Sequence, residues 1–358
     1  MPLDIAIERT QHSRRESADF DALGFGDLFS DHIFSMEWYD GAWRDARIEP
    51  YGPIALEPGT ASLHYGQLIF EGLKAFYGVD GRIRLFRPDA NARRFRDSCQ
   101  RLCIPPLPEE DFVTAVSALV HVDRAWIPTR RGQALYIRPL LFGTETHLDV
   151  RPSRCYRFLI MTSPVREYFA NGFAPIALKV EERYTRAARG GTGFAKTAGN
   201  YAASLLPTAE SQRQGYHQVL WLDGCEHRYV EEVGQMNIFF HLEGRVVTPP
   251  LSGTILPGVT RDSVITLLRD RGIRVEERPI EIAEILEAVQ SSRLQEAFGS
   301  GTAAVVAPIG RIGYQDDQYN LPTNLENSLA RWLYDEILGI QYGSVADRHN
   351  WTRIVDPT

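Results

Sequence analysis

Short β-rich runs alternate with helical runs along this 358-residue chain, and that mixed order narrows the possible folds more than any other feature. Runs rich in aliphatic or aromatic residues predict strands at residues 134–142, 156–161, 176–180, 218–222 and 237–241. Helical spacing of apolar residues predicts helices at residues 90–102, 261–271 and 325–338. Because a regular strand–helix–strand rhythm is absent, we expect mixed α/β or α+β domains rather than a doubly wound sheet.

The length of the chain favours two domains. The segment SPVREYFANGFAP, residues 163–175, has proline near both ends and an Asn-Gly pair, which is typical of a connection. The first twenty residues lack the apolar core of a secretory signal. We therefore predict a disordered extension at 1–22, a small N-terminal α/β domain at 23–165, an interdomain loop at 166–176 and a larger C-terminal α/β domain at 177–358 that carries the reactive lysine discussed below.

Composition excludes several classes of partner. A formal net charge of -7 argues against nucleic acid or an anionic membrane as the main partner, because neutralising phosphates requires a basic excess. No run of eighteen apolar residues occurs, so no membrane-spanning helix is expected. The four cysteines form neither a CxxC pair nor a disulfide framework, which favours a reducing compartment and predicts no metal site.

The segment RGGTGFAKTAGNY, residues 189–201, concentrates four glycines around a single lysine. Glycine costs backbone order, so the backbone here is expected to turn tightly or to approach a ligand, and Lys196 can form a Schiff base with an aldehyde. A flexible surface loop with a solvated lysine explains the segment equally well. The segment also nearly matches the phosphate-binding pattern GxxxxGK[ST], but Ala195 stands where that pattern requires glycine.

A lysine-bound pyridoxal cofactor also needs an acid at its ring nitrogen and a seat for its phosphate. Glu232, in VEEVGQMNIFF, lies where a turn enters an apolar strand, although Glu231 and Glu232 could equally be a solvated pair. In LPGVTRDSV, Thr260 is predicted to be a helix N-cap, and the amides of Val259 and Thr260 would face an anion. The small-residue turn at 299–303 offers further amides.

Together these segments resemble the branched-chain aminotransferases, which have fold type IV among pyridoxal-phosphate enzymes. The match covers nearly everything beyond the first twenty residues and runs in order through FGDLFSDHIFSMEW, LHYGQLIFEGLKAF, FRPDANARRF, LYIRPLLFGTE, GGTGFAKTAGNYAAS, VEEVGQMNIFF, LSGTILPGVTRDS and FGSGTAAVVAPIG. The resemblance implies pyridoxal 5'-phosphate as cofactor, a two-domain fold, a cytoplasmic location and a homodimer. In such a homodimer the loop GTETHLDVRPSR of the neighbouring subunit would close the substrate pocket.

The resemblance also implies a role for each matching residue. Lys196 would form the Schiff base and move the substrate proton, Tyr201 would bond to the ring oxygen, and Glu232 would pair with the ring nitrogen. The remaining cofactor contacts would come from Arg94, Val259, Thr260 and Thr302 at the phosphate and Asn237 at the ring. The substrate would meet Tyr136, Thr302 and Ala303 at its α-carboxylate, apolar walls from Phe70, Tyr168 and Met236, and Arg138 and Tyr65 at the distal carboxylate of glutamate.

The implied reaction is a ping-pong transamination between leucine, isoleucine or valine and 2-oxoglutarate. Gln235 departs from the small residue or threonine that is usual in the family, so an aromatic or unusual amino acid in a specialised pathway is an alternative substrate. A D-amino-acid aminotransferase, an aminodeoxychorismate lyase and a nucleotide-binding P-loop protein are further alternatives. Strand alternation alone also accounts for the pair Tyr136 and Arg138.

Overall fold

The computed structural model describes residues 3–166 and 173–355, and the chain divides into two units. Unit 1 comprises Met1–Tyr168, Ala195–Ala198 and Gly339–Thr358, and unit 2 comprises Phe169–Phe194 and Gly199–Leu338. The predicted C-terminal domain at 177–358 therefore differs from unit 2 at residues 195–198, which include Lys196, and at residues 339–358. Hydrogen bonds explain the first difference, because the carbonyl oxygen of Lys196 accepts the Phe70 amide at 3.0 Å. The predicted interdomain loop at 166–176 lies mostly outside the described residues.

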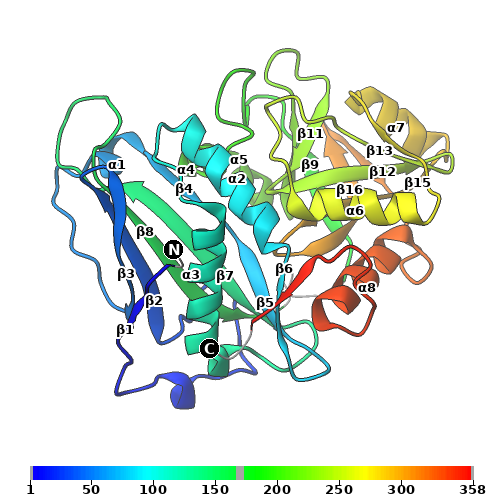
Figure 1. The fold of residues 1–358 in the computed structure, drawn as a ribbon. Helices are drawn as coiled ribbons and strands as arrows, with labels where there is room; N and C mark the ends of the chain where they lie inside the picture. The colour runs from blue at the N-terminus through cyan, green and yellow to red at the C-terminus, as the bar shows by residue number, and fades with distance from the viewer. Residues whose placement is uncertain (1–2, 167–172, 356–358) are drawn as a thin grey trace. The chain divides into compact units, whose positions relative to one another are not determined.

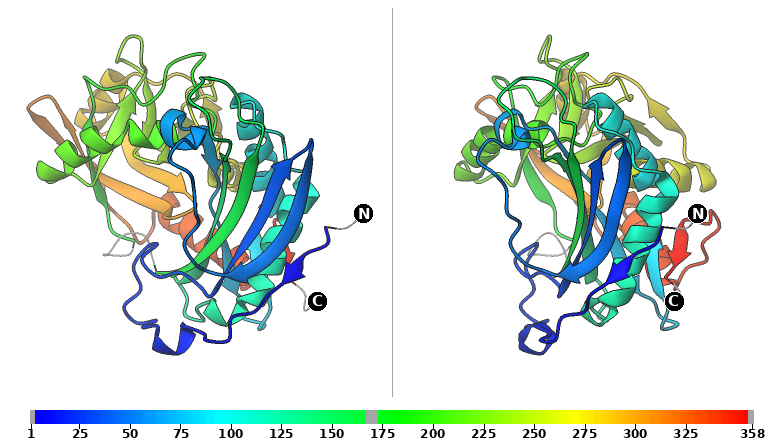
Figure 2. Two further views of the ribbon diagram at one scale, coloured as in Figure 1. Left: turned by 90° about the vertical axis from the view of Figure 1, so that its left-hand side faces the viewer. Right: turned by 60° about the vertical axis from the view of Figure 1, so that its left-hand side comes forward.

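The N-terminal segment from residue 3 to residue 22 is not the disordered extension that we predicted. Strand β1 (Ala6–Ile7) pairs in parallel with β3 (Ala42–Pro50) at the edge of the sheet of unit 1 (Figure 2). The amide of Thr10 donates to His32 Nε2 at 2.9 Å, and His32 Nδ1 lies 2.6 Å from Asp123 Oδ1. Since these partners are distant in sequence, local composition could not reveal the contacts.

The secondary structure of unit 1 is built around a sheet that, within the described residues, has nine strands in the order β1-β3-β2-β8-β7-β5-β6-β18, with β4 paired to β7 (Figure 1). Its remaining strands are β2 (His32–Tyr39), β4 (Leu68–Phe70), β5 (Leu73–Tyr77), β6 (Ile83–Phe86), β7 (Ala134–Gly143), β8 (Tyr156–Val165) and β18 (Thr352–Ile354). Its helices are η1 (Arg15–Ser17), α1 (Ala61–Tyr65), α2 (Pro88–Arg101), α3 (Glu109–Val122) and η2 (Arg124–Trp126).

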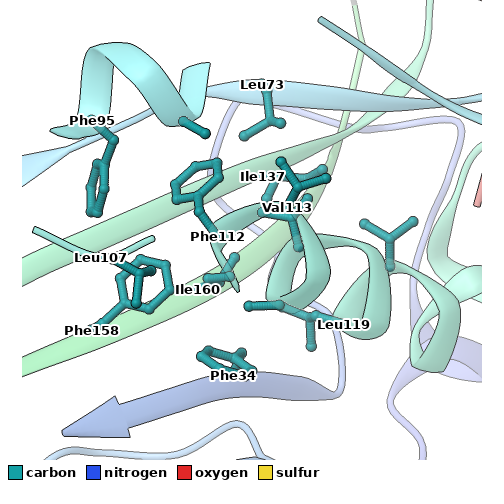
Figure 3. Close-up of a cluster of buried hydrophobic side chains, with 14 of the residues drawn as sticks. Phe34, Leu73, Phe95, Leu107, Phe112, Val113, Leu119, Ile137, Phe158 and Ile160 are labelled. Carbon is teal, nitrogen blue, oxygen red and sulfur yellow. The ribbon is translucent and has the colours of Figure 1, made fainter. Parts of the chain in front are cut away.

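Aromatic and aliphatic side chains from α2 and α3 pack against one face of this sheet to form the core of unit 1 (Figure 3). Phe112 of α3 lies with its ring centroid 5.1 Å from that of Phe95 of α2 and 6.0 Å from that of Phe158 of β8. These side chains are almost fully buried, and each contributes about 1.5–3 kcal/mol to stability by leaving water. The core thereby fixes α2, which carries several candidate site residues.

Unit 2 contains a second sheet with the order β11-β10-β9-β16-β15-β12-β13-β14, and β17 pairs with β16. Because β11 also pairs with β12, the strands from β11 through β16 to β12 form a closed ring. The strands are β9 (Ile176–Val180), β10 (Gln218–Leu222), β11 (Val230–Val233), β12 (Met236–Leu242), β13 (Arg245–Thr248), β14 (Val275–Glu277), β15 (Leu294–Gly301), β16 (Val305–Tyr314) and β17 (Asp317–Asn320). The helices are α5 (Leu205–Arg213), α6 (Val259–Asp270) and α7 (Ile282–Gln290), while α4 (Ala198–Ala202) and α8 (Leu329–Tyr342) cross the division between the units.

The predicted strands correspond to β7, β8, β9, β10 and β12, and the predicted helices correspond to α2, α6 and α8. Helix α8 begins four residues later than predicted. The carboxylate of Glu296, on β15, accepts the amides of Leu329 and Ala330 at 2.8 and 3.0 Å and so fixes the first turn. None of the helices in the described ranges is long and apolar enough to span a membrane.

Candidate active site

Lys196 is held by its backbone on both sides within unit 1. Its amide donates to Ser98 Oγ of α2 at 2.9 Å, and its carbonyl oxygen accepts the Phe70 amide. Its Nζ lies 5.0 Å from the centre of the Phe70 ring. The neighbouring Ala195 and Thr197 are buried, so the alternative of a loose, solvated loop is wrong for this part of the segment.

A buried ion pair lies beside this lysine. Arg94 donates from Nε and Nη2 to the two carboxylate oxygens of Glu71, at 2.7 and 2.8 Å, and Asn91 donates to the same carboxylate at 2.7 Å. Burial by itself raises the pKa of Glu71, but the Arg94 guanidinium, its hydrogen bonds and the charge of Lys196 lower the pKa below its usual value. Asn91, Arg94 and Ser98 share one face of α2 because they are spaced by three and four residues.

Tyr136 and Arg138 extend from the same face of β7 and contact each other. Arg138 Nη2 donates to the Tyr136 hydroxyl at 3.0 Å, and the guanidinium lies 4.8 Å from the centre of the Phe70 ring. Arg138 Nε is buried and has no hydrogen-bond partner among the described residues. Gly72 permits this arrangement, because a Cβ at that position would overlap the Tyr136 hydroxyl. A half-buried cation with a buried, unused donor is suited to an anionic ligand.

Tyr65 lies apart from that contact. Its side chain is exposed and its hydroxyl donates to the carbonyl oxygen of Leu148. The link fixes one point of the loop after Phe142, the loop that the resemblance implied would close a neighbouring pocket. Tyr168, predicted to be an apolar wall, lies outside the described residues.

In unit 2, Glu232 is a buried carboxylate with partners on both oxygens. Its Oε1 accepts the Leu256 amide at 2.9 Å and Asn237 Nδ2 at 3.2 Å, while its Oε2 lies 2.7 Å from Arg186 Nε. Glu232 and Glu231 are only 3% and 7% exposed. The alternative of a solvated acidic pair is therefore wrong.

Glu231 differs from its neighbour in its contacts. Burial raises the pKa of Glu231, and a hydrogen bond from the Thr254 hydroxyl together with the charge of Arg186 opposes this shift only in part. Its Oε2 has no hydrogen-bond partner among the described residues. Strand β11 thus carries two buried acids, and Arg186 forms its ion pair with Glu232.

The glycine-rich segment before the lysine folds tightly within unit 2. Thr192 and Asn200 bond reciprocally, with Thr192 Oγ1 donating to Asn200 Oδ1 at 2.7 Å and Asn200 Nδ2 donating to the Thr192 carbonyl at 2.8 Å. A Cβ on Gly193 would overlap the carbonyl oxygen of Thr254 and lie 2.7 Å from Ala187 Cβ. We expected the glycines to let the backbone turn tightly or approach a ligand. At Gly193 the backbone instead packs closely against the backbone of Thr254.

Helix α6 begins with the amides of Val259 and Thr260, as predicted, but its N-cap lies two residues earlier than predicted. Gly258 is the N-cap, and Thr260 is the second residue of the helix instead of its cap. The first helical hydrogen bond runs from the Asp262 amide to the Gly258 carbonyl at 3.0 Å, so the amides of Val259 and Thr260 belong to the first turn. Gly258 lets the Asn237 side chain approach the start of the helix, because a Cβ at position 258 would overlap Asn237 Oδ1.

Thr302 and Ala303 lie in the turn between β15 and β16, where both are half-buried. Met236 packs beside this turn, since a Cβ on Gly301 would be 3.3 Å from Met236 Cγ. A cavity of about 20 Å³ lies nearby in unit 2 and has room for about one water molecule. The residues lining it are Arg186, Asn200, Tyr201, Ser204, Glu232, Gly234, Gln235, Asn237 and Leu256.

The structure thus brings the candidate residues together in two local groups. Lys196, Arg94, Phe70, Tyr136 and Arg138 gather in unit 1. Glu232, Asn237 and Tyr201 meet around the cavity of unit 2, in whose sheet and helices Met236, Val259, Thr260, Thr302 and Ala303 also lie. Sequence reasoning assigned no role to Glu71, Arg186 or Asn200. Glu71 and Asn200 lie inside segments that the resemblance covers, but only their tertiary contacts distinguish them from the residues around them.

Comparison with known proteins gives a consistent result. Residues 68–312 match the family model described as Amino-transferase class IV. The chain is 46% identical to branched-chain-amino-acid aminotransferase 2 of Bacillus subtilis over 97% of this chain and 96% of that protein. It is 47% identical to the branched-chain-amino-acid aminotransferase of Mycobacterium tuberculosis over 97% and 95% of the two chains.

Solved structures agree with these sequence matches. The T.th. branched-chain amino acid aminotransferase in complex with N-(5'-phosphopyridoxyl)-L-glutamate superposes with a TM-score of 0.72 at 26% identity, covering 90% of this chain and 98% of that one. The Escherichia coli branched-chain amino acid aminotransferase superposes with a TM-score of 0.73 at 25% identity, covering 90% and 99%. The predicted mixed α/β fold is confirmed by these likenesses.

Proposed function

We propose that this chain, which belongs to the class IV aminotransferase family, transfers the amino group of leucine, isoleucine or valine to 2-oxoglutarate with pyridoxal 5'-phosphate as cofactor. The observation that carries the proposal is the setting of Lys196, whose backbone is fixed by Ser98 and Phe70 and whose amine lies over an aromatic ring beside a buried ion pair. The relatives named above act on branched-chain amino acids, and this supports the substrate class.

The residues present fit the cofactor by their chemistry. An aldehyde requires an amine, a phosphate requires a cation and helix amides, and a ring nitrogen requires an acid. Lys196 supplies the amine, Arg94 the cation, the first turn of α6 the amides, and Glu232 the acid. Tyr201, Asn237 and Thr302 are the further cofactor contacts that we propose. When bound, pyridoxal phosphate supplies an electron-withdrawing ring that accepts charge from the carbon losing its proton.

The chain's own residues then bind the substrate and move the proton. We propose that the free amine of Lys196 would take the proton from the α-carbon of the amino acid and deliver it to the carbon that carried the cofactor's aldehyde oxygen, and that in the second half-reaction it would move a proton in the opposite direction. Tyr136 and the amides of Thr302 and Ala303 would bind the α-carboxylate. The two substrates would react in turn, so that the first 2-oxo acid leaves before 2-oxoglutarate enters.

The side-chain pocket must accept both an aliphatic and an acidic side chain. We propose that Phe70, Met236 and Tyr168 form the apolar walls, and that Arg138 and Tyr65 receive the distal carboxylate of glutamate. The unused Nε of Arg138 supports this role. Gln235 lines the cavity beside Tyr201 and leaves an aromatic or unusual amino acid as a second candidate substrate.

We also propose a homodimer located in the cytoplasm. Leu148 and Val150 are 71% and 83% exposed in the loop after Phe142, and such apolar exposure is typical of an interface. The four cysteines are free, which suits a reducing compartment. Sedimentation of the purified protein as a monomer would contradict the dimer.

The chain allows a direct test of the lysine, because it has only three lysines, Lys74, Lys179 and Lys196. Borohydride treatment of the cofactor-loaded protein should fix the cofactor on Lys196, as read by peptide mass. Lys196→Ala should lose the visible absorption band and the turnover. Lys179→Ala should keep both, since the Lys179 amine lies in an exposed position on the Gln315 carbonyl. Cofactor on Lys74 or Lys179, or turnover by Lys196→Ala, would refute the assignment.

Substrate class requires a separate measurement. Leucine, glutamate and an aromatic amino acid would be added singly to the loaded protein while the visible band is followed. Loss of the band with leucine and with glutamate is the expected result. If the band responds only to the aromatic amino acid, the protein is still an aminotransferase. Its substrate is then an aromatic amino acid and not a branched-chain one.

A further inference from the structure

Arg186 connects three separate segments of unit 2. Its Nε lies 2.7 Å from Glu232 Oε2, and its Nη2 donates to the carbonyl oxygens of Gly193, at 3.1 Å, and Thr254. The Arg186 side chain is only 8% exposed. One guanidinium therefore fixes β11, the glycine-rich segment and the loop that leads to α6.

The contacts of Arg186 are arranged around Glu232 in a specific way. Arg186 approaches Oε2, while the Leu256 amide and Asn237 donate to Oε1. The adjacent acid, Glu231, bonds to the Thr254 hydroxyl instead, and burial raises its pKa. The Arg186 guanidinium, 2.7 Å from the buried Glu232 carboxylate, favours its charged form.

This electrostatic setting matters for a carboxylate that faces a basic ring nitrogen. When a carboxylate meets a pyridine nitrogen, the two groups can share one proton. The proton stays on the group that has the higher pKa. A neighbouring cation makes the carboxyl group the stronger acid, and the proton then stays on the nitrogen. The electron-withdrawing effect of the ring depends on that charge.

The geometry points to Arg186 as a positioning residue that holds Glu232 ionised and oriented, so that the proton shared with the cofactor lies on the ring nitrogen. The inference rests on the proposed function, in which Glu232 meets that nitrogen. Arg186 acts through Glu232 and through the backbone of residues 193 and 254. Only a forked side chain with several donors can contact a carboxylate and two carbonyl oxygens together.

The test compares two cofactors in cofactor-free protein refilled from solution: pyridoxal phosphate and its 1-deaza analogue, in which a C–H group replaces the ring nitrogen. Arg186→Met should weaken binding of pyridoxal phosphate about tenfold more than binding of the analogue, because an adjacent cation changes proton affinity by about one pKa unit or more. Arg186→Lys keeps a charge and should restore most of that selectivity. Arg183→Met, an exposed arginine three residues earlier, should bind both like the wild type.

A second readout follows the carboxylate without any cofactor. In ¹³C-glutamate-labelled protein, the Glu232 signal, assigned with Glu232→Gln, should show proton uptake at higher pH in Arg186→Met than in the wild type. This measurement remains informative if the methionine variant binds cofactor poorly. Titration of Glu232 at the same pH in both proteins would overturn the inference.

The outcomes separate this inference from the proposed function. Equal weakening of both cofactors by Arg186→Met would make Arg186 a packing residue and overturn the inference alone, provided that Lys196 still carries the cofactor. A wild-type protein that takes up no pyridoxal phosphate would overturn the proposed function, and the inference with it.

Discussion

Arg94 and Glu71 form a two-point ion pair inside unit 1, with Nε and Nη2 of the arginine donating to opposite oxygens of one carboxylate. Glu71 is fully buried, and Asn91 and the Gly72 amide also donate to it. The direction of the guanidinium is thus set before any ligand arrives, which reduces the entropy lost on binding.

Replacing only the cation of this pair should destabilise the protein strongly. Arg94→Met leaves a buried carboxylate without its guanidinium and should lower the free energy of unfolding by about 3–5 kcal/mol. Urea unfolding of the cofactor-free protein measures this loss. Arg93→Met, on the exposed face of the same helix, is the control and should cost little. The double variant Glu71→Met with Arg94→Met should be more stable than Arg94→Met alone, and the reverse order would contradict this account.

Asp223 predicts a pH dependence of stability. Its carboxylate accepts the backbone amides of Cys225, Glu226, Arg228 and Tyr229 in the turn before β11. Burial opposes its ionisation, but these amides outweigh it and lower the pKa of Asp223 to about 2. Because the folded pKa lies below the unfolded one, the carboxylate stabilises the fold above about pH 4 and loses that effect as the pH falls towards 2.

The measurement for Asp223 compares Asp223→Asn with the wild type by urea unfolding at several pH values. At pH 7 the variant should be less stable by about 2 kcal/mol. The difference should shrink as the pH falls from about 4 towards 2, because the unfolded wild-type chain takes up a proton on Asp223 before the folded protein does. A difference that stays constant down to about pH 3 would show that the charge has no part in the stabilisation.

Sequence reasoning succeeded where a local pattern determines the structure. Helix α2 was predicted from its apolar spacing after Pro88, and the tight packing of the lysine segment was anticipated from its glycines. It failed where a distant partner decides the outcome. Glu296 fixes the start of α8, Gly258 replaces Thr260 as the cap of α6, and β3 orders the N-terminal segment.

The same distinction holds for the site. Lys196 stood out because it is the only lysine in a glycine-rich segment, and Glu232 because it lies where a turn enters an apolar strand, although a solvated acidic pair was an equal alternative. Arg186 is one arginine among many in the chain, and only its contacts with Glu232, Gly193 and Thr254 distinguish it. Such contacts depend on the folded arrangement of three segments, which no local pattern specifies.

Arg138 should control the acidic substrate more than the aliphatic one. Arg138→Gln removes the cation beside Phe70 while keeping a polar side chain. The value of kcat/KM for glutamate and 2-oxoglutarate should fall by about 10- to 100-fold, as expected for loss of a charge-assisted hydrogen bond, whereas the value for leucine should change much less. Steady-state kinetics of each half-reaction distinguishes the two. An equal loss for leucine would assign Arg138 to the α-carboxylate or to the fold.

Two glycines of the lysine segment should respond oppositely to the same substitution. At Gly193 an added Cβ would overlap the Thr254 carbonyl oxygen and lie 2.7 Å from Ala187 Cβ, so Gly193→Ala must displace backbone and should cost about 1–3 kcal/mol. At Gly199, within α4, an added Cβ meets no described atom within 4 Å, and alanine should be neutral or stabilise the helix by up to about 1 kcal/mol. Thermal unfolding of both variants measures the contrast, and cofactor uptake should fall only in Gly193→Ala because Arg186 bonds to that backbone. If both variants unfold like the wild type, the close approach at Gly193 has no role in holding the segment.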